Sequence, residues 1–339
     1  MDLFLFVACI LVGVPLGLAD PLVDEEWDVW KQSYGKIYSN TEEDQARRGV
    51  WLENLWHIQA HNVLYSQGNS SYKMAMNQFG DLTSLEFNQL YTDKKIYEFS
   101  NLTIEGLFDV GLEESDEVGE LGAFPRKIDW RQDRLVRKVK HQGRCSSCYA
   151  FSAIGALEGQ LAKKKHQYME LSEQNIIDCS DEFKNYGCRG GLPYRAFKYM
   201  RDYGIQSSTS YPYRGKRNDK CLFNSSQSVI KIKGFKRFKN NKDKQLARMV
   251  ARVGPISVLI HSSHSSWRFY KSGVYDNSNC KQKLINHSVL LIGYVDRRSK
   301  SYWIIKNSWG TSWGENGYMR IIKGKNMCGI NYCAAYPEI

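Results

Sequence analysis

The chain has 339 residues, of which 42% are hydrophobic and 24% are charged. This is the composition of a globular protein, and the length excludes one simple folding unit. The charge is uneven: residues 1–123 carry 7 basic and 21 acidic groups (net −14), and residues 124–339 carry 40 and 15 (net +25). This asymmetry predicts two parts that attract each other, less strongly once acid protonates the carboxylates.

The N-terminus has the pattern of a secretory signal peptide. An apolar run from Leu3 to Leu16 precedes Gly17-Leu18-Ala19, a small-x-small cleavage pattern, so we expect residues 1–19 to be removed. Asp2 stands where a positive charge is usual. The alternative is a membrane anchor, but the run is short, Pro15 interrupts it and no basic stop-transfer segment follows. No later segment is apolar enough to span a membrane, and we expect no nucleic-acid partner for a secreted chain.

Residues 43–62 have the periodicity of an amphipathic helix. Side chains on one face recur at intervals of three or four residues, namely Glu43, Arg47, Trp51, Asn54, Ile58 and Asn62. Thr41 is the expected N-cap, and Glu43 and Arg47 form an i,i+4 pair of opposite charge.

The composition then changes. Residues 101–123 are acidic, rich in glycine and poor in aromatic residues, which is typical of an extended linker. We place a boundary at Phe124-Pro125.

Beyond this boundary a helix-rich half precedes a strand-rich half. Helices are expected over three segments: 148 to about 164, 171–177 and 194–199. Phe151, Ile154, Leu157 and Leu161 share a face of the first. Strands are expected at 256–260, 288–292 and 302–306, where short apolar runs are bounded by Gly, Asn or Ser.

Eight of the nine cysteines lie beyond the signal segment, in a chain expected to enter an oxidising compartment. An even number is compatible with four disulfides. Cys145 and Cys148, in HQGRCSSCYAF, could contribute to a structural disulfide, a metal site or a redox pair, or one of them could be a reactive nucleophile. A zinc site lacks a second ligand pair at suitable spacing, so we expect no metal and no other cofactor.

Three distant segments combine into a known pattern. They contain Gln142 and Cys148, then His287 within LINHSVL, then Asn307 within YWIIKNSWGTSWG. The helix at 43–62 matches the propeptide motif ERFNIN, with Trp51 in place of Phe, and residues 75–81 match GxNxFxD, with Ala75 in place of Gly. In these features the chain resembles a papain-family cysteine protease of the cathepsin L/S/K type, made as a preproenzyme.

The resemblance implies an α+β fold with two lobes, preceded by a helical inhibitory propeptide. We expect a propeptide at 20–123 and a protease at 124–339, with a helical lobe to about residue 230 and a barrel-like lobe after it. The implied function is a secreted or lysosomal cysteine endopeptidase, monomeric, that hydrolyses polypeptides. Its implied partners are its own propeptide and cystatin-type inhibitors.

The resemblance also assigns roles. Cys148, at a helix start where the dipole favours a thiolate, is the nucleophile, paired with His287 as imidazolium. Asn307 orients His287, and Trp309 shields their contact. Gln142 and the backbone N–H of Cys148 bind the oxyanion. Taken singly, each residue has a simpler structural explanation, such as a buried thiol or a core histidine, but together they match all four positions of one family.

The resemblance implies three disulfides, which leave two of the eight cysteines beyond the signal segment as free thiols. Cys145 pairs with Cys188, Cys179 with Cys221, and Cys280 with Cys328, so that Cys148 is the free nucleophile. The remaining thiol, Cys333, is interpreted as a small buried hydrophobic residue.

Some positions depart from the family pattern. Ser146 replaces a usual Gly and makes the P1 preference uncertain; Tyr149 replaces Trp, and Arg189 replaces Asn. Gly190 and Gly191 still permit close approach of an extended substrate. A catalytically silent binding protein on the same scaffold, or a secreted inhibitor built on the propeptide, are the alternatives.

The resemblance places five uncharged residues around the S2 pocket: Leu192, Pro193, Leu259, Ser288 and Cys333. We therefore expect an apolar P2 residue. Leu259 is bulky for its position, which favours a shallow pocket and Val or Leu over Phe.

Two further sequence patterns concern the protein surface, namely glycosylation sequons and a basic run. Asn69, Asn101 and Asn224 begin glycosylation sequons, whereas the formal sequon at Asn286 is expected to stay unmodified because a glycan would block the cleft. A basic run at 231–239, with Lys242 and Lys244, is either solvated surface or a polyanion site, for example for a glycosaminoglycan.

Overall fold

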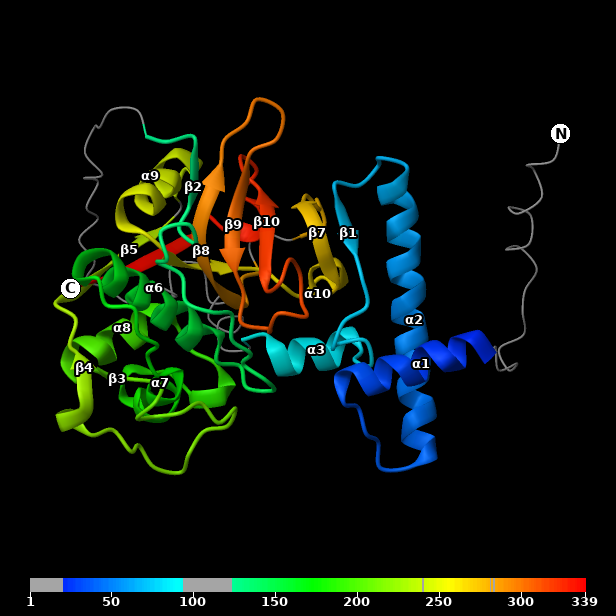
Figure 1. The fold of residues 1–339 in the computed structure, drawn as a ribbon, viewed down its shortest axis with the longest axis horizontal. Helices are drawn as coiled ribbons and strands as arrows, with labels where there is room; N and C mark the ends of the chain where they lie inside the picture. The colour runs from blue at the N-terminus through cyan, green and yellow to red at the C-terminus, as the bar shows by residue number, and fades with distance from the viewer. Residues whose placement is uncertain (1–20, 94–123, 240, 281, 283) are drawn as a thin grey trace.

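A computed structural model describes residues 21–93, 124–239, 241–280, 282 and 284–339 (Figure 1). The expected signal peptide, the linker at 101–123 and the sequon at Asn101 lie outside the described residues. Within the described residues, no helix combines the length and the apolar character that crossing a membrane requires.

The N-terminal part is built around two crossing helices, α1 (Pro21–Tyr34) and α2 (Thr41–Ser66), followed by β1 (Tyr72–Met74) and α3 (Ser84–Tyr91) (Figure 1). Trp27, Trp30 and Trp51 are buried where α1 and α2 cross, with ring centroids 5.1–6.3 Å apart. These aromatic contacts hold the two helices together.

One local prediction for α2 is wrong, and a second needs to be extended. The N-cap is Asn40 rather than Thr41, since the Asn40 side chain accepts the backbone N–H of Glu43. Arg47 pairs with Glu86 at 2.7 Å, whereas Glu43 accepts the backbone and side-chain donors of Ser39. Tertiary contacts of Arg47 with the GxNxFxD-like segment and α3 therefore add to the expected i,i+4 pair, whose members still attract each other.

The helical lobe is organised around α6 (Cys148–Lys165). This helix is buried on almost every side from Cys148 to Ala162, because it lies between the other helices of its lobe and the sheet. The remaining elements of the lobe are α7 (Glu173–Cys179), η1 (Asp181–Phe183), η2 (Gly187–Arg189), α8 (Pro193–Asp202), β3 (Ile205–Gln206), η3 (Ser225–Gln227) and β4 (Ser228–Ile230). The three predicted helices are present, with α7 beginning two residues later than expected, after the N-cap Ser172.

The other lobe is a strongly curved sheet. Its described strands follow the order β1-β7-β10-β9-β8-β6-β11-β5, and β2 also pairs with β8. Their bounds are β2 (Lys127–Asp129), β5 (Gly234–Lys239), β6 (Ile256–Ile260), β7 (Tyr270–Tyr275), β8 (His287–Val295), β9 (Tyr302–Lys306), β10 (Tyr318–Ile322) and β11 (Cys333–Glu338), with α9 (Asp243–Val253), α10 (Ser265–Arg268) and η4 (Met327–Gly329) between them. The predicted strands at 256–260 and 302–306 have the observed bounds, and the third extends to Val295.

The division into halves needs two corrections. Residues 127–129, expected in the helical lobe, form β2 and pair with β8 of the sheet. The strand-rich half contains an eleven-residue helix, α9, whose apolar side packs against β8 and β6. Sequence order therefore only approximates the lobes.

The N-terminal part contacts both lobes. β1 pairs antiparallel with β7 and extends the sheet by one strand, while α3 lies beside the sheet (Figure 1). Phe79 and Phe87 pack edge-on against Trp309 with centroid distances of 5.7 and 5.2 Å. The chain that follows α3 enters the region between the lobes.

Candidate active site

Cys148 is the first residue of α6 and carries a free, buried thiol. Because it begins the helix, its backbone N–H has no partner inside the helix. The helix is held against the sheet by Ser152, whose hydroxyl donates to the carbonyl of Val289 at 2.7 Å. This packing places Cys148 beside Ser288, the residue that follows His287 on β8.

His287 is the first residue of β8, and Asn307 directly follows the neighbouring strand β9. Nε2 of His287 lies 2.8 Å from Oδ1 of Asn307, and the backbone N–H of Ser308 donates to the same oxygen at 2.8 Å. The Ser308 bond identifies Oδ1 as the acceptor, so Nε2 of His287 must be the donor. Nδ1 then keeps its lone pair, and it has no hydrogen-bond partner among the described residues.

Trp309 covers this contact. Its indole is fully buried and stacks on the His287 ring with a centroid distance of 4.7 Å and an interplanar angle of 28°. It thereby keeps water from the apolar side of the imidazole.

The protonation states follow from burial. Burial raises the pKa of the Cys148 thiol to about 12, and the nearby carboxylate of Asp93 adds to this rise. Burial also lowers the pKa of His287 to about 4, although the bond to Asn307 acts in the opposite direction. In this covered state, burial favours the neutral thiol and the neutral imidazole, and the thiolate–imidazolium pair stays a prediction for the uncovered site.

Gln142 lies at the same end of α6. Its Nε2 donates to the carbonyl of Cys145 at 2.9 Å, and its Oε1 accepts the Ser308 hydroxyl at 2.7 Å. The backbone N–H of Gln142 also donates to the carbonyl of Ser308. These bonds fix the carboxamide and leave its second N–H for another acceptor.

Residues 92 and 93 cover the site. The Ser146 hydroxyl donates to the carbonyl of Thr92 at 3.0 Å, and the backbone N–H of Gly191 donates to Oδ2 of Asp93 at 2.7 Å. The backbone N–H of Asp93 donates to the carbonyl of Asn286 on the opposite lobe. The chain after α3 therefore bridges the two lobes across the cleft. Sequence reasoning did not single out Asp93.

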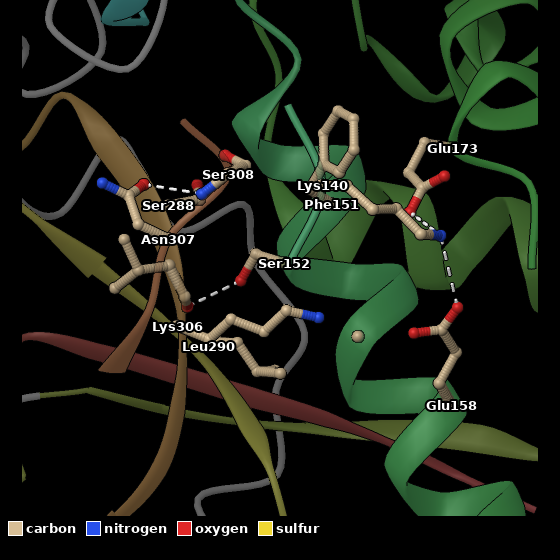
Figure 2. A pocket seen from close by; sticks show the side chains of 12 residues that line it. Lys140, Phe151, Ser152, Glu158, Glu173, Ser288, Leu290, Lys306, Asn307 and Ser308 are labelled. Carbon is tan, nitrogen blue, oxygen red and sulfur yellow. Dashed lines mark hydrogen bonds and ion pairs between the residues drawn. The ribbon is translucent and has the colours of Figure 1, made fainter. Parts of the chain in front are cut away.

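A neighbouring pocket unites four of the five expected S2 residues: Leu192, Pro193, Leu259 and Cys333. Ser288 lines a different cavity, between α6 and the sheet (Figure 2). Tyr194 and Arg237 line the first pocket as well, and neither was predicted. Arg237 lies far from the other residues in sequence and reaches them only through strand pairing.

The cavity of Figure 2 contains a buried cluster of charges that no sequence pattern indicated. Lys140 lies between Glu173 at 2.7 Å and Glu158 at 3.5 Å. Burial acts to lower the pKa of Lys140, but these carboxylates more than offset it, so that its pKa is raised. Lys306 lines the same cavity, where burial lowers its pKa to about 8. The cluster joins α6 and α7 to the segment that carries Gln142.

Three disulfides occur among the described residues: Cys145–Cys188, Cys179–Cys221 and Cys280–Cys328. These are the pairs that the family resemblance implies. Cys148 and Cys333 are free, and burial raises the pKa of Cys333 to about 12. Cys333 is therefore a poor nucleophile in this environment.

The predicted glycosylation sites and the basic run differ in how exposed they are. Asn69 and Asn224 are exposed, whereas Asn286 is only 4% exposed and accepts hydrogen bonds from Ser262. In the basic run and its extension, five lysines are exposed: Lys231, Lys233, Lys239, Lys242 and Lys244. No group of His, Cys, Asp and Glu that could hold a metal occurs in the described part of the chain.

Comparisons with known proteins agree with this architecture. The family model for papain family cysteine protease matches residues 124–338, and the model for the cathepsin propeptide inhibitor domain matches residues 27–87. Cathepsin K of Mus musculus is 40% identical over 341 residues, and cathepsin L2 of Homo sapiens is 40% identical over 349 residues, in each case over the full length of both chains. Among solved structures, procathepsin L 3 of the Tenebrio molitor larval midgut is 36% identical with a TM-score of 0.81, covering 94% of this chain and 99% of that one.

Proposed function

Because this chain belongs to the papain family of cysteine proteases, with the family's propeptide inhibitor domain at its N-terminus, we propose that Cys148, His287, Asn307 and Gln142 form its catalytic machinery. The chain is the zymogen of a cysteine endopeptidase, and its propeptide is its own inhibitor. The observation that best supports the proposed machinery is the His287–Asn307 bond, which leaves Nδ1 of His287 as a base, while the free thiol of Cys148 at the start of α6 lies beside Ser288, the next residue of β8.

The first step requires removal of the propeptide from the cleft. Once residues 92 and 93 leave, water reaches the site and the Asp93 carboxylate no longer opposes a thiolate. The Cys148 proton then passes to Nδ1 of His287, and the α6 dipole stabilises the thiolate that forms.

In acylation the thiolate attacks the carbonyl carbon of the scissile peptide bond. The carbonyl oxygen becomes an oxyanion that accepts the backbone N–H of Cys148 and a side-chain N–H of Gln142. The C–N bond breaks, His287 gives its Nδ1 proton to the leaving amine, and a thioester remains on Cys148.

Deacylation reverses the roles. His287 takes a proton from water, the hydroxide equivalent attacks the thioester carbon, and the carbon–sulfur bond breaks. The carboxylic product leaves, and the proton on His287 returns to the departing sulfur, which restores the Cys148 thiol and the neutral imidazole. Asn307 keeps the imidazole oriented through both steps.

Titration of the processed enzyme with a thiol-reactive epoxide tests the assignment of Cys148. We expect one equivalent to abolish peptidase activity and to label Cys148, while Cys148→Ser is inactive and unlabelled. Complete inactivation with label on Cys333 only would contradict the proposal.

We further propose boundaries, specificity and destination. The propeptide comprises residues 20–123 and the protease residues 124–339. The apolar lining by Leu192, Pro193 and Leu259 supports a preference for Val or Leu over Phe at P2. The N-terminal apolar segment supports the secretory pathway, ending in the lysosome or outside the cell.

We also propose additional contacts. The exposure of Asn69 and Asn224 supports glycosylation there, and that of the basic run supports polyanion binding, which salt should reverse. A cystatin-type inhibitor would occupy the same cleft as the propeptide, and the processed enzyme would be a monomer.

A further inference from the structure

The pocket beside the cleft is largely apolar, and Arg237 is the one charged residue among those that line it in the described chain. Leu192 and Pro193 stand at the start of α8, Leu259 belongs to β6, and Cys333 begins β11. Arg237 of β5 is paired with Ala335 of β11, which also lines the pocket. Strand pairing thus brings a guanidinium to the wall of an otherwise uncharged pocket.

Arg237 is held in place by an aromatic ring. Its guanidinium carbon lies 3.8 Å from the ring centroid of Tyr194, at the distance of a cation–π contact. Partial burial lowers the pKa of Arg237, but an arginine starts from such a high value that it stays charged at every pH of interest.

The charge of Arg237 is reinforced by its neighbours. Arg195 and Lys198 each lie 5.7 Å from the Tyr194 ring centroid. The positive charges of Lys239 and Arg237 both act to lower the pKa of Cys333, which lines the pocket. The described lining residues include no carboxylate, so the electrostatic potential in the pocket near Arg237 is positive.

Gly191 lies next to the pocket in sequence and binds the chain that covers the site. The backbone N–H of Gly191 binds the propeptide residue that now occupies the cleft, and the next residue, Leu192, lines the pocket. A substrate backbone that takes the same N–H places the side chain of the bound residue at the pocket mouth.

We propose that Arg237 is a specificity-determining residue, and that the S2 pocket accepts glutamate in addition to Val and Leu while rejecting Lys and Arg. This inference rests on the proposed function. Two methylenes of a P2 glutamate would lie along the apolar wall, and its carboxylate would form a charge-assisted hydrogen bond with the guanidinium. A P2 Lys or Arg would bring a like charge to Arg237, and the described residues that line the pocket include no carboxylate.

The test uses the processed enzyme at pH 6, where a P2 glutamate is ionised. Fluorogenic peptides that differ only at P2 carry Leu, Glu, Gln or Lys, and kcat/KM is measured for each. We expect Glu to exceed Gln and Lys to be cleaved least. In Arg237→Met, the Glu-to-Gln ratio should fall about tenfold or more, because one charge-assisted hydrogen bond is lost.

Two variants serve as controls. Arg237→Lys keeps the charge and should keep part of the preference for Glu over Gln. Arg252→Met removes an exposed arginine of α9 in the same lobe and should leave the ratio unchanged.

The outcomes are separable. If the wild type does not cleave the Leu peptide, the proposed function itself fails. If it cleaves Leu but does not prefer Glu over Gln or Lys, or if the ratio is the same in Arg237→Met, the inference about Arg237 is overturned. Should Arg237→Met not fold, the wild-type ranking together with Arg237→Lys decides the question.

Discussion

The backbone N–H of Gly191 donates a 2.7 Å hydrogen bond to the carboxylate of Asp93, which joins the substrate cleft of the protease to the chain that blocks it. Asp93 is fully buried, and its backbone N–H reaches Asn286 on the other lobe. Asp93 therefore contacts both lobes and places a negative charge near Cys148.

Asp93→Ala should weaken inhibition. Loss of a hydrogen bond to a charged group is expected to speed self-processing of the zymogen about tenfold at a fixed pH. Without the carboxylate, the pKa of Cys148, measured by alkylation of the unprocessed zymogen, should fall, because Asp93 contributes to its rise. Glu53→Ala removes an exposed acid of α2 and is the matched control. Equal processing rates for the two variants would refute the role of Asp93.

Asn307→Ala should impair catalysis rather than binding. Without the acceptor for Nε2, the imidazole loses its orientation, so kcat should fall roughly 100-fold with little change in KM. Asn307→Asp keeps an oxygen for both His287 and Ser308, and should retain more activity than Asn307→Ala. Steady-state kinetics of the processed variants decide this, and full activity of Asn307→Ala would contradict the mechanism.

Histidines lie where α2 contacts the segment around α10, and they lead us to expect that acid releases the propeptide. His57 of α2 contacts the Ser265 hydroxyl at 2.9 Å. Desolvation lowers the pKa of His57, with His61 and Arg268 contributing, and it lowers the pKa of His264, with His57 and His61 contributing. The docked state therefore favours the neutral form of both rings. The propeptide binds the protease most strongly above the ordinary histidine pKa of about 6.5. Its binding weakens as the pH falls below this value, because the histidines bind protons more tightly after release.

The variant His57→Gln isolates this effect. Cleavage of Cys148→Ser zymogen by added mature enzyme should be about threefold slower at pH 5 when His57 is replaced, and unchanged at pH 7. The same slowing at both pH values would mean a structural defect instead of a titration effect. Processing of the wild type that is no faster at pH 4–5 than at neutral pH would also rule out the attraction expected from the −14 and +25 charges.

Lys140→Met should destabilise the protein strongly. It leaves Glu158 and Glu173 buried without their common cation, which typically costs about 3–5 kcal/mol. Thermal unfolding of Cys148→Ser zymogen, which cannot process itself, measures this loss. Lys140→Met combined with Glu173→Gln should recover part of the stability, and no recovery would argue against an unpaired charge as the cause.

Local sequence patterns were enough to predict several helices and strands and the candidate catalytic residues of this protein. The helix at 148–165 and the strands at 256–260 and 302–306 were predictable because apolar periodicity reports the face that a segment buries. The family motifs likewise indicated two lobes, a helical propeptide and the residues Cys148, His287, Asn307 and Gln142. All of these depend on residue order along one segment, or on a match between segments.

Only the tertiary structure decided how distant segments meet. Arg47 pairs with Glu86, residues 127–129 join the sheet, and Asp93 occupies the cleft. Arg237 lines the pocket because β5 pairs with β11, and Lys140 meets Glu173 in a cavity between the lobes. The physical reason is that a charged side chain has no periodic signature: its partner and its pKa are set by burial and by neighbours that chain folding brings from elsewhere in the sequence.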